Sequence, residues 1–364
     1  MKRIFCSALV LCLFCGCGGE PLDSAWLQAD GYTASTYDAE SQDNLYLKSN
    51  GDFVVGALYD YESDGALYRL SLQDGVVSTE WFSDFCGLQY YNLLGVDGEN
   101  GVFITGTSSQ GTVRILRLDE QGQEVLHIDM DDTVPDQGVY SFTWDQDHYY
   151  FLVNRWSEDP ETAYNSYLEV YDHQGQLVIQ TDLAHSLAST AGFLPQEDEW
   201  MEELEGRDED LLLSQLFPEG PQDSVGLLRL PDGNPGMLIC RKSPIDGERY
   251  GILCPMDGTF SITPACCYPI ASRDGWPLTT YFESRDPEYA LLINTEEGLM
   301  GLSLDGSTTP LFTWSTIDFS PQNLTAMQPG PADDTCTGPG NTLWIRSWNM
   351  ELDGFDLCVL TPNT

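Results

Sequence analysis

The chain has 364 residues, and its 58 acidic residues against 15 basic ones give a formal net charge of −43. Such a chain repels nucleic-acid phosphates and anionic lipid headgroups, because both are bound through lysine and arginine. We therefore exclude nucleic acid as a partner. The length suits one large domain or two ordinary ones.

Residues 1–16 have the pattern of a signal peptide. Two basic residues precede an apolar run over residues 4–16, which is too short for a membrane-spanning helix of about 20 residues. Cys12 and Cys15 form a C-x-x-C pair. Neither the second ligand pair of a zinc site nor the βαβ pattern of a redox motif follows it.

The next segment, "LFCGC" (13–17), places the small residue Gly16 directly before Cys17. It resembles the lipobox of bacterial lipoproteins. The resemblance implies lipid attachment at Cys17 and a location on the extracytoplasmic face of the bacterial cell membrane. Residues 17–34 are then the lipidated tether, and a covalent acyl anchor suits a chain whose charge repels anionic lipid.

A repeated β unit fills residues 35–364, which we expect to form one domain. Its clearest part is a strand, a tight turn with Asp and Gly, and a second strand; it occurs at 66–82, 113–129, 167–183, 250–266 and 299–314. The turn needs Gly because a tight hairpin places one residue at positive φ. Further apolar strands precede each of these segments, which makes four strands per unit.

Four-stranded repeats of 40–50 residues are typical of β-propeller blades. We expect an all-β propeller of six blades, with seven as the alternative; the blades start near residues 35, 84, 132, 222, 271 and 321. The last unit stops after its third strand. We therefore expect the N-terminal segment around residues 25–35 to supply the missing outer strand.

Residues 186–221 break the β pattern between blades 3 and 4. This acidic segment has helical apolar spacing at Trp200, Met201 and Leu204, and Gly206 interrupts it. We expect one or two short amphipathic helices that act as a lid or as filler. A partner-binding element and a degenerate seventh blade are the alternatives.

Three features together resemble the propeller regions of clostridial surface lipoproteins: the signal with Cys17, the repeat "LYRLSLQDG" (67–75) and the ending "LCVLTPNT" (357–364). In that family the propeller precedes a solute-binding domain. The resemblance implies an association with an ABC-type uptake system. This chain contains no such domain, which argues against a direct transport role.

Seven cysteines follow Cys17, an odd number that leaves at least one thiol without an internal partner. Free buried thiols are one interpretation. Two disulfides are the alternative, Cys240 with Cys254 across a hairpin turn, and Cys336 with Cys358.

Basic residues are scarce, so their positions are informative. Arg155 and Arg241 fall at matching positions at the end of the second strand of blades 3 and 4, and Arg346 lies near the corresponding place in blade 6. Equivalent blade positions share one rim, so these residues are candidates for an anionic-ligand site. Ion pairing with the many acids is the alternative.

Four acids crowd one loop: Asp129, Asp131, Asp132 and Asp136. Calcium favours such oxygen ligands, but the EF-hand spacing is absent and a solvated loop is the simpler interpretation. We expect no other metal or cofactor.

The sequence contains no P-loop, H-E-x-x-H or G-x-S-x-G motif, and we assign no catalytic residue. We expect a monomeric, surface-anchored propeller that binds a protein, peptide or glycan. The alternative function is a polysaccharide hydrolase or lyase that uses carboxylates at the central funnel.

Overall fold

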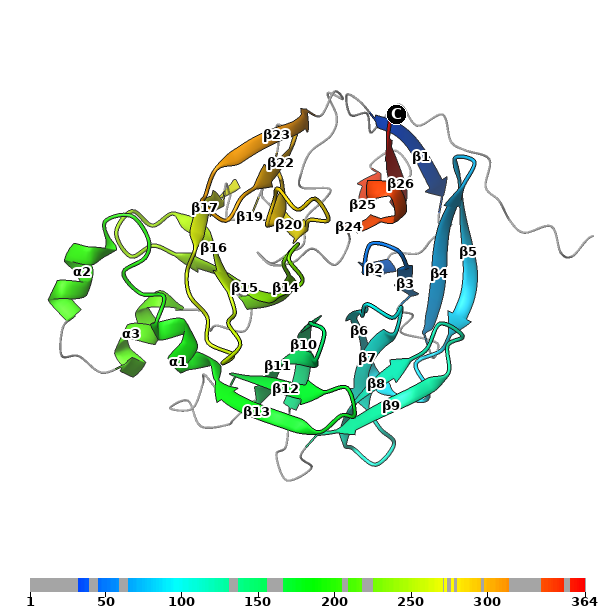
Figure 1. Cartoon of the computed structure of the whole chain (residues 1–364), viewed down its shortest axis with the longest axis horizontal. Helices are drawn as coiled ribbons and strands as arrows, with labels where there is room; N and C mark the ends of the chain where they lie inside the picture. Colours follow the sequence, from blue (N-terminus) through cyan, green and yellow to red (C-terminus); the bar gives the residue numbers. More distant parts are fainter. Residues whose placement is uncertain are drawn as a thin grey trace, which may run out of the picture.

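The computed structural model is a six-bladed β-propeller (Figure 1). It describes residues 32–38, 45–58, 65–130, 137–155, 166–204, 209–217, 225–270, 272–273, 276–277, 280–295, 298–313, 335–349 and 354–363. Each blade is a four-stranded antiparallel sheet, and the innermost strands contact one another in a closed ring around the axis. The expectation of six blades is confirmed.

The strands follow one another from the axis outward in each blade. Blade 1 consists of β2 (Leu45–Ser49), β3 (Val54–Leu58), β4 (Ala66–Gln73) and β5 (Val76–Ser83). Blade 2 consists of β6 (Gln89–Val96), β7 (Val102–Thr107), β8 (Val113–Leu118) and β9 (Glu124–Asp129). Blade 3 consists of β10 (Gln137–Trp144), β11 (His148–Arg155), β12 (Ser166–Asp172) and β13 (Leu177–Asp182).

The second half of the ring repeats this order. Blade 4 consists of β14 (Val225–Arg229), β15 (Pro235–Lys242), β16 (Arg249–Pro255) and β17 (Cys266–Ile270). Blade 5 consists of β20 (Thr280–Glu283), β21 (Leu291–Asn294), β22 (Gly298–Leu302) and β23 (Thr308–Thr313). A short ribbon of β18 (Ser272–Arg273) and β19 (Trp276–Pro277) precedes blade 5. Blade 6 consists of β24 (Thr335–Gly338), β25 (Thr342–Asn349), β26 (Gly354–Pro362) and β1 (Tyr32–Asp38), with the 3₁₀ turn η3 (Pro339–Asn341) between β24 and β25.

In blades 2 to 5, a five-residue turn of one geometry joins the two outer strands. In blade 2 the N–H of Asp119 donates to the carbonyl of Gln123, and the N–H of Gly122 donates back to the carbonyl of Asp119. The Asp119 carboxylate accepts the N–H groups of Gln121 and Gln123. Gly122 has a φ of 73°, the left-handed conformation that this bulged hairpin requires.

Blades 3, 4 and 5 use the same turn at residues 172–176, 257–261 and 303–307. In blade 4 the left-handed residue is Phe260, with a φ of 64°, and not the expected Gly258. Asp257 therefore keeps the first position of the turn, while Gly258 follows it directly and does not occupy the left-handed fourth position.

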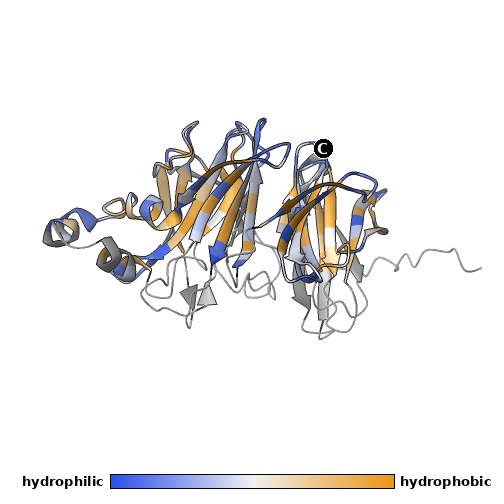
Figure 2. Cartoon of the chain, turned by 90° about the horizontal axis from the view of Figure 1, so that it is seen from below, coloured by the Kyte–Doolittle hydropathy of each residue, from blue (hydrophilic) through white to orange (hydrophobic). Residues whose placement is uncertain are grey.

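The blades are held together by apolar faces that pack against each other. Between blades 2 and 3, the rings of Phe103 and Phe142 stack with centroids 4.4 Å apart, and Phe151 packs beside them. Apolar residues concentrate in the strands, and hydrophilic residues concentrate in the turns at one rim (Figure 2). Each sheet thus buries both faces, as radial stacking requires.

The ring closes through a strand from the N-terminal segment. β1 pairs with β26 in an antiparallel register that runs from Tyr32 opposite Pro362 to Asp38 opposite Asp356. The closing strand therefore spans residues 32–38, somewhat later than the expected 25–35.

Three short helices follow blade 3: α1 (Leu183–Ala188), α2 (Glu197–Leu204) and α3 (Glu209–Leu216). The sequence predicted one or two. It missed α1, which has only six residues and begins where the Asp182 side chain accepts the N–H of Ala184. Of the described helices, none is long and apolar enough to cross a membrane.

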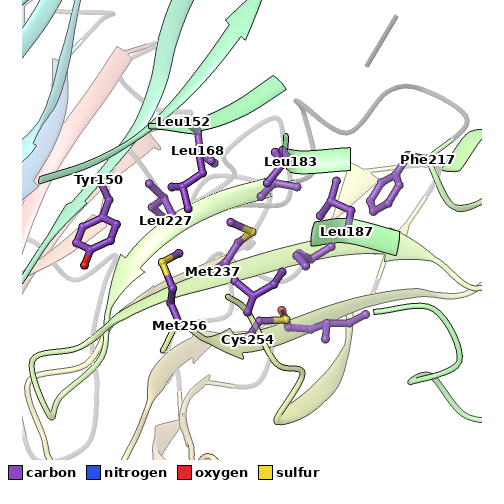
Figure 3. Close-up of a cluster of buried hydrophobic side chains, with 14 of the residues drawn as sticks. Tyr150, Leu152, Leu168, Leu183, Leu187, Phe217, Leu227, Met237, Cys254 and Met256 are labelled. Atoms are coloured by element: carbon purple, nitrogen blue, oxygen red, sulfur yellow. Dashed lines mark hydrogen bonds between the residues drawn. The ribbon is translucent and has the colours of Figure 1, made fainter. Parts of the chain in front are cut away.

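The helices fill a wedge between blades 3 and 4. Leu183 and Leu187 of α1, together with Phe217 after α3, belong to one buried cluster with Leu168 of blade 3 and Met237 of blade 4 (Figure 3). The insertion is therefore part of the packed core between two blades.

Removal of β1 should destabilise the whole ring. A variant that lacks residues 1–38 loses the backbone hydrogen bonds to β26, which contribute about 0.5–1.5 kcal/mol each. We expect it to unfold at a clearly lower temperature than the full chain in a circular-dichroism melt. A variant that lacks residues 1–31 retains β1 and is the matched control. Equal midpoints for the two truncations would contradict the role of β1 in closure.

Candidate functional site

Arg241, which the sequence predicted to bind an anionic ligand, forms an ion pair in the protein interior. Its guanidinium donates from Nη1 and Nη2 to the two carboxylate oxygens of Glu197, at 2.8 and 2.7 Å. Nη2 also donates to the carbonyl of Thr190 at 2.9 Å. Both side chains of the pair are fully buried. This bidentate pair connects α2 to the second strand of blade 4.

Arg155 has a similar role within blade 3. Its Nη2 donates to Glu169 at 3.0 Å, and its guanidinium lies 4.6 Å from the centroid of the Tyr167 ring. The buried Glu169 carboxylate also accepts hydrogen bonds from Tyr171 and Gln180. The structure thus places Arg155 and Arg241 in separate ion pairs, each with its own carboxylate.

Other predicted site residues lie partly or wholly outside the residues that the structure describes. The backbone of Arg346 pairs with Leu357, but its side chain lies outside the described residues, as does the whole of Cys17. Asp131, Asp132 and Asp136, the remaining calcium candidates, also lie outside them.

Asp129, the described member of the calcium candidates, is ion-paired with Arg114. A hydrogen bond from Arg114 lowers the pKa of Asp129. Within the described residues, no group of three or more His, Cys, Asp or Glu side chains is arranged to hold a metal ion.

The strand register argues against the two disulfides that were the alternative to free thiols. Cys240, Cys254, Cys336 and Cys358 are buried and form no disulfide within the described residues. Cys254 lies opposite Met237, three residues from Cys240, and an odd offset places the two thiols on opposite faces of the sheet. Strand β25 separates Cys336 from Cys358, a distance of about 9–10 Å between Cα atoms. A disulfide needs less than about 7 Å.

A different group of residues, one aromatic and three charged, lies at the axis. We call Trp144, Arg229, Glu283 and Arg285 the axial cluster. Trp144, Arg229 and Glu283 are the last residues of the innermost strands of blades 3, 4 and 5, and Arg285 follows Glu283 by two residues. Figure 1 shows these strands, β10, β14 and β20, around the centre of the ring.

Direct contacts join the members of the axial cluster. The guanidinium carbon of Arg229 lies 3.8 Å from the centroid of the Trp144 ring. The backbone N–H of Arg229 donates to Glu283 Oε1 at 2.8 Å, and Arg285 Nη2 lies 3.7 Å from Glu283 Oε2. Residues from three blades therefore form one connected group.

Arg285 also reaches blade 1 on the far side of blade 6. Its Nη2 donates to the carbonyl of Ser49 at 3.4 Å. A Cβ atom at Gly51 would lie 2.6 Å from Arg285 Nε, so only glycine permits this approach. The Arg285 side chain thus crosses the axial end from blade 5 to blade 1.

Neighbouring turns hold the cluster in place. Trp144 Nε1 donates to the carbonyl of Val96 in blade 2 at 3.0 Å. Asn50 of blade 1 donates to the carbonyl of Asp97, and the Asp97 carboxylate accepts from Arg117 at 2.6 Å. Hydrogen bonds therefore link blade 1 to blade 2, and blade 2 to the cluster.

The positive charge of Arg229 is incompletely compensated. Burial and then the charge of Arg285 lower the pKa of Arg229, against the opposite effect of Glu283. The contrast is Arg114, whose hydrogen bond with Asp129 raises its pKa. The buried Nε atoms of Arg229 and Arg285, like those of Arg155 and Arg241, have no hydrogen-bond partner within the described part of the chain. An anion placed beside Arg229 would stabilise its guanidinium group.

The cluster is open to solvent on one side. The Arg285 and Glu283 side chains retain 20% and 30% of their exposure. Sequence reasoning missed this group because it aligned arginines at the end of the second strand. Those positions lie one strand away from the axis, whereas the ends of innermost strands converge on it. The sequence signal that could have found the axial cluster is a basic residue at or just after the end of the first strand of a blade.

Comparisons with known proteins give distant structural matches. No protein-family model matches the chain, and no curated protein matches its sequence. Among solved structures, a gluconolactonase from Xanthomonas campestris is 15% identical with a TM-score of 0.48, covering 93% of this chain and 91% of its own.

Other structural matches have different functions. The WD40 domain of Toxoplasma gondii coronin is 10% identical with a TM-score of 0.40, covering 93% of this chain and 88% of its own. An α-L-arabinofuranosidase of Fusarium graminearum is 10% identical with a TM-score of 0.41, and the match covers 89% of this chain and 97% of the arabinofuranosidase. At such similarity, function has to be argued from this chain's own residues.

The Arg241–Glu197 pair yields a stability prediction. Arg241→Met leaves a buried carboxylate without its counter-ion and should lower the free energy of unfolding by about 3–5 kcal/mol. Glu197→Gln should also destabilise, and the double variant should lose much less than the sum of both. Urea titration measures all three. Arg114→Met, which breaks a surface pair, is the control and should cost less than about 1 kcal/mol. Additive losses in the double variant would contradict the pairing.

Proposed function

We propose that this protein is a binding module that receives its ligand at the axial cluster. The observation that carries the proposal is that Glu283 contacts two arginines at the axial end, in a chain with a net charge of −43: the backbone N–H of Arg229 donates to it, and Arg285 Nη2 lies 3.7 Å from it. Guanidinium groups and an aromatic ring are groups that binding sites use for polar and anionic ligands.

The carboxylates nearby support binding rather than bond cleavage. Asp97 accepts the N–H groups of Glu99 and Gly101 as well as Arg117. Asp145 accepts the N–H groups of Asp147 and His148. These acids shape turns. A glycosidase of the usual kind needs instead a carboxylic acid that can give its proton to the leaving group.

The proposal is tested by screening the full chain on glycan and peptide arrays, with a parallel assay for release of reducing ends. We expect binding without turnover. The double variant Arg229→Gln/Arg285→Gln should lose that binding, and Arg114→Gln, which removes one peripheral positive charge, should retain it. Release of reducing ends would instead favour the hydrolase. Binding that survives in the double variant would exclude the axial cluster as the site.

We further propose that Cys17 carries lipid and holds the propeller on the outer face of a bacterial membrane. The lipobox-like segment at residues 13–17 supports this. Cys17→Ser should abolish acylation and move the protein from the membrane fraction to the soluble fraction, as followed by labelling with an alkyne fatty acid. Unchanged membrane association in Cys17→Ser would contradict the anchor.

A further inference from the structure

We infer that the protein has a second binding site, at the opposite axial end of the ring, where Tyr90 stacks against a neutral sugar ring. The site is independent of the axial cluster and goes beyond the proposed function. Tyr90 is the second residue of β6, the innermost strand of blade 2. The last residue of β6, Val96, accepts the hydrogen bond from Trp144 of the axial cluster, so the first residues of β6 lie at the other end.

The Tyr90 ring is left in water. It is the most exposed of the large apolar side chains in the described part of the chain, with 90% of its surface accessible. No hydrogen bond or ring contact holds this side chain among those residues. A tyrosine ring gains free energy when its apolar surface is covered, and the fold does not cover this one.

The backbone of Tyr90 has a conformation that aromatic residues avoid. Its φ is 48°, in the left-handed region where a Cβ atom crowds the backbone. Tyr90 and Tyr91 form a bulge in the pairing of β6 with β7, between Gln89 and Asn92. Bulges re-aim side chains, and strained residues cluster where a protein clamps a ligand.

The neighbouring residues fix this bulge. The Tyr91 ring stacks on Phe85 with the ring centroids 4.0 Å apart. A Cβ atom at Gly106 of β7 would lie 2.9 Å from the carbonyl oxygen of Gln89, so glycine is needed where β7 passes the bulge. Tyr90 is therefore presented on a fixed backbone, which reduces the entropy lost when a ligand binds.

The groups beside the ring fit a sugar. The π face of an aromatic ring is negative, and a pyranose with equatorial hydroxyl groups presents weakly positive C–H groups on its flat faces. Its hydroxyl groups lie around the edge and both donate to and accept from amides. Gln89 and Asn92, which flank the bulge, are exposed and carry such amides.

A second tyrosine lies in the neighbouring blade. Tyr46 is the second residue of β2, the position that Tyr90 has in β6, and its side chain is half-buried. The strands β2 and β6 are in contact near the centre of the ring (Figure 1). An oligosaccharide is therefore a better probe of this end than a single sugar.

The surroundings of Tyr90 select against charged and apolar ligands. Residues 84–96 contain one acid and no base, so an anionic sugar finds no opposite charge there in a chain with a net charge of −43. The exposed neighbours of Tyr90 in this segment are polar or small: Asp84, Cys86, Gly87, Gln89 and Asn92. An apolar peptide side chain needs an apolar groove, which these neighbours do not form.

The test uses the full chain and three soluble probes: cellohexaose, hexagalacturonate and glycyl-phenylalanyl-glycine. Titration calorimetry measures affinity, and saturation-transfer NMR identifies the sugar protons that contact the protein. We expect cellohexaose to bind at least about tenfold more tightly than each other probe, with saturation at its C–H protons. Its affinity should change by less than about twofold as salt is raised, because the sugar is uncharged.

Variants assign this binding to the Tyr90 ring. Tyr90→Ala should weaken cellohexaose binding about tenfold or more, and Tyr90→Phe, which keeps the ring, should stay within about threefold of the parent protein. Tyr90→Gly should lose binding and melt no lower than the parent, because glycine adopts a positive φ without strain. Trp81→Ala is the matched control, since it removes an aromatic ring that is 63% exposed on the outer strand of blade 1.

The outcomes separate this site from the axial cluster. The double variant Arg229→Gln/Arg285→Gln should bind cellohexaose as the parent protein does. Loss in that variant with retention in Tyr90→Ala would overturn the Tyr90 site and leave the proposed function intact. Tighter binding of hexagalacturonate or of the peptide would overturn the neutral sugar. An absence of cellohexaose binding, or an equal loss in Trp81→Ala, would overturn the inference as a whole.

Discussion

The antiparallel pairing of β1 with β26 joins residues 32–38 to the last strand of the chain and turns an open row of sheets into a ring. Each blade packs against its neighbours alone, so an open row would leave an unpaired strand edge and an uncovered apolar face. Closure also sets the geometry at the axis. Arg285 of blade 5 contacts Ser49 of blade 1, two blades that face each other only because blade 6 is complete.

Within this ring the acidic residues do more than keep the protein soluble. Asp119 shapes a turn by accepting backbone N–H groups, and Glu169 and Glu197 neutralise arginines that the strands and helices bury. Arg229 and Arg285 differ because they share one glutamate, which accepts from the backbone N–H of Arg229 and lies beside the guanidinium group of Arg285. The proposed function depends on that difference, since breaking a buried ion pair destabilises the fold, while a guanidinium group that is partly open to solvent is available to a ligand.

Much of this architecture could be predicted from sequence, because strand alternation and Asp-Gly turns are local signals that repeat. The six blades and the helical stretch after blade 3 follow from them. Contacts between blades leave no such signal. Arg241 is paired with a residue 44 positions away, and Arg229 contacts Glu283, 54 positions away. Free thiols and disulfides stayed open as alternatives because closeness in sequence does not determine which face of a sheet a thiol occupies.

A crystal structure of the full chain with the ligand that the arrays identify decides whether the axial cluster is the ligand site. We expect ligand atoms within about 3.2 Å of side-chain nitrogen atoms of Arg229 or Arg285. A ligand bound away from Trp144, Arg229, Glu283 and Arg285 would contradict the proposed site.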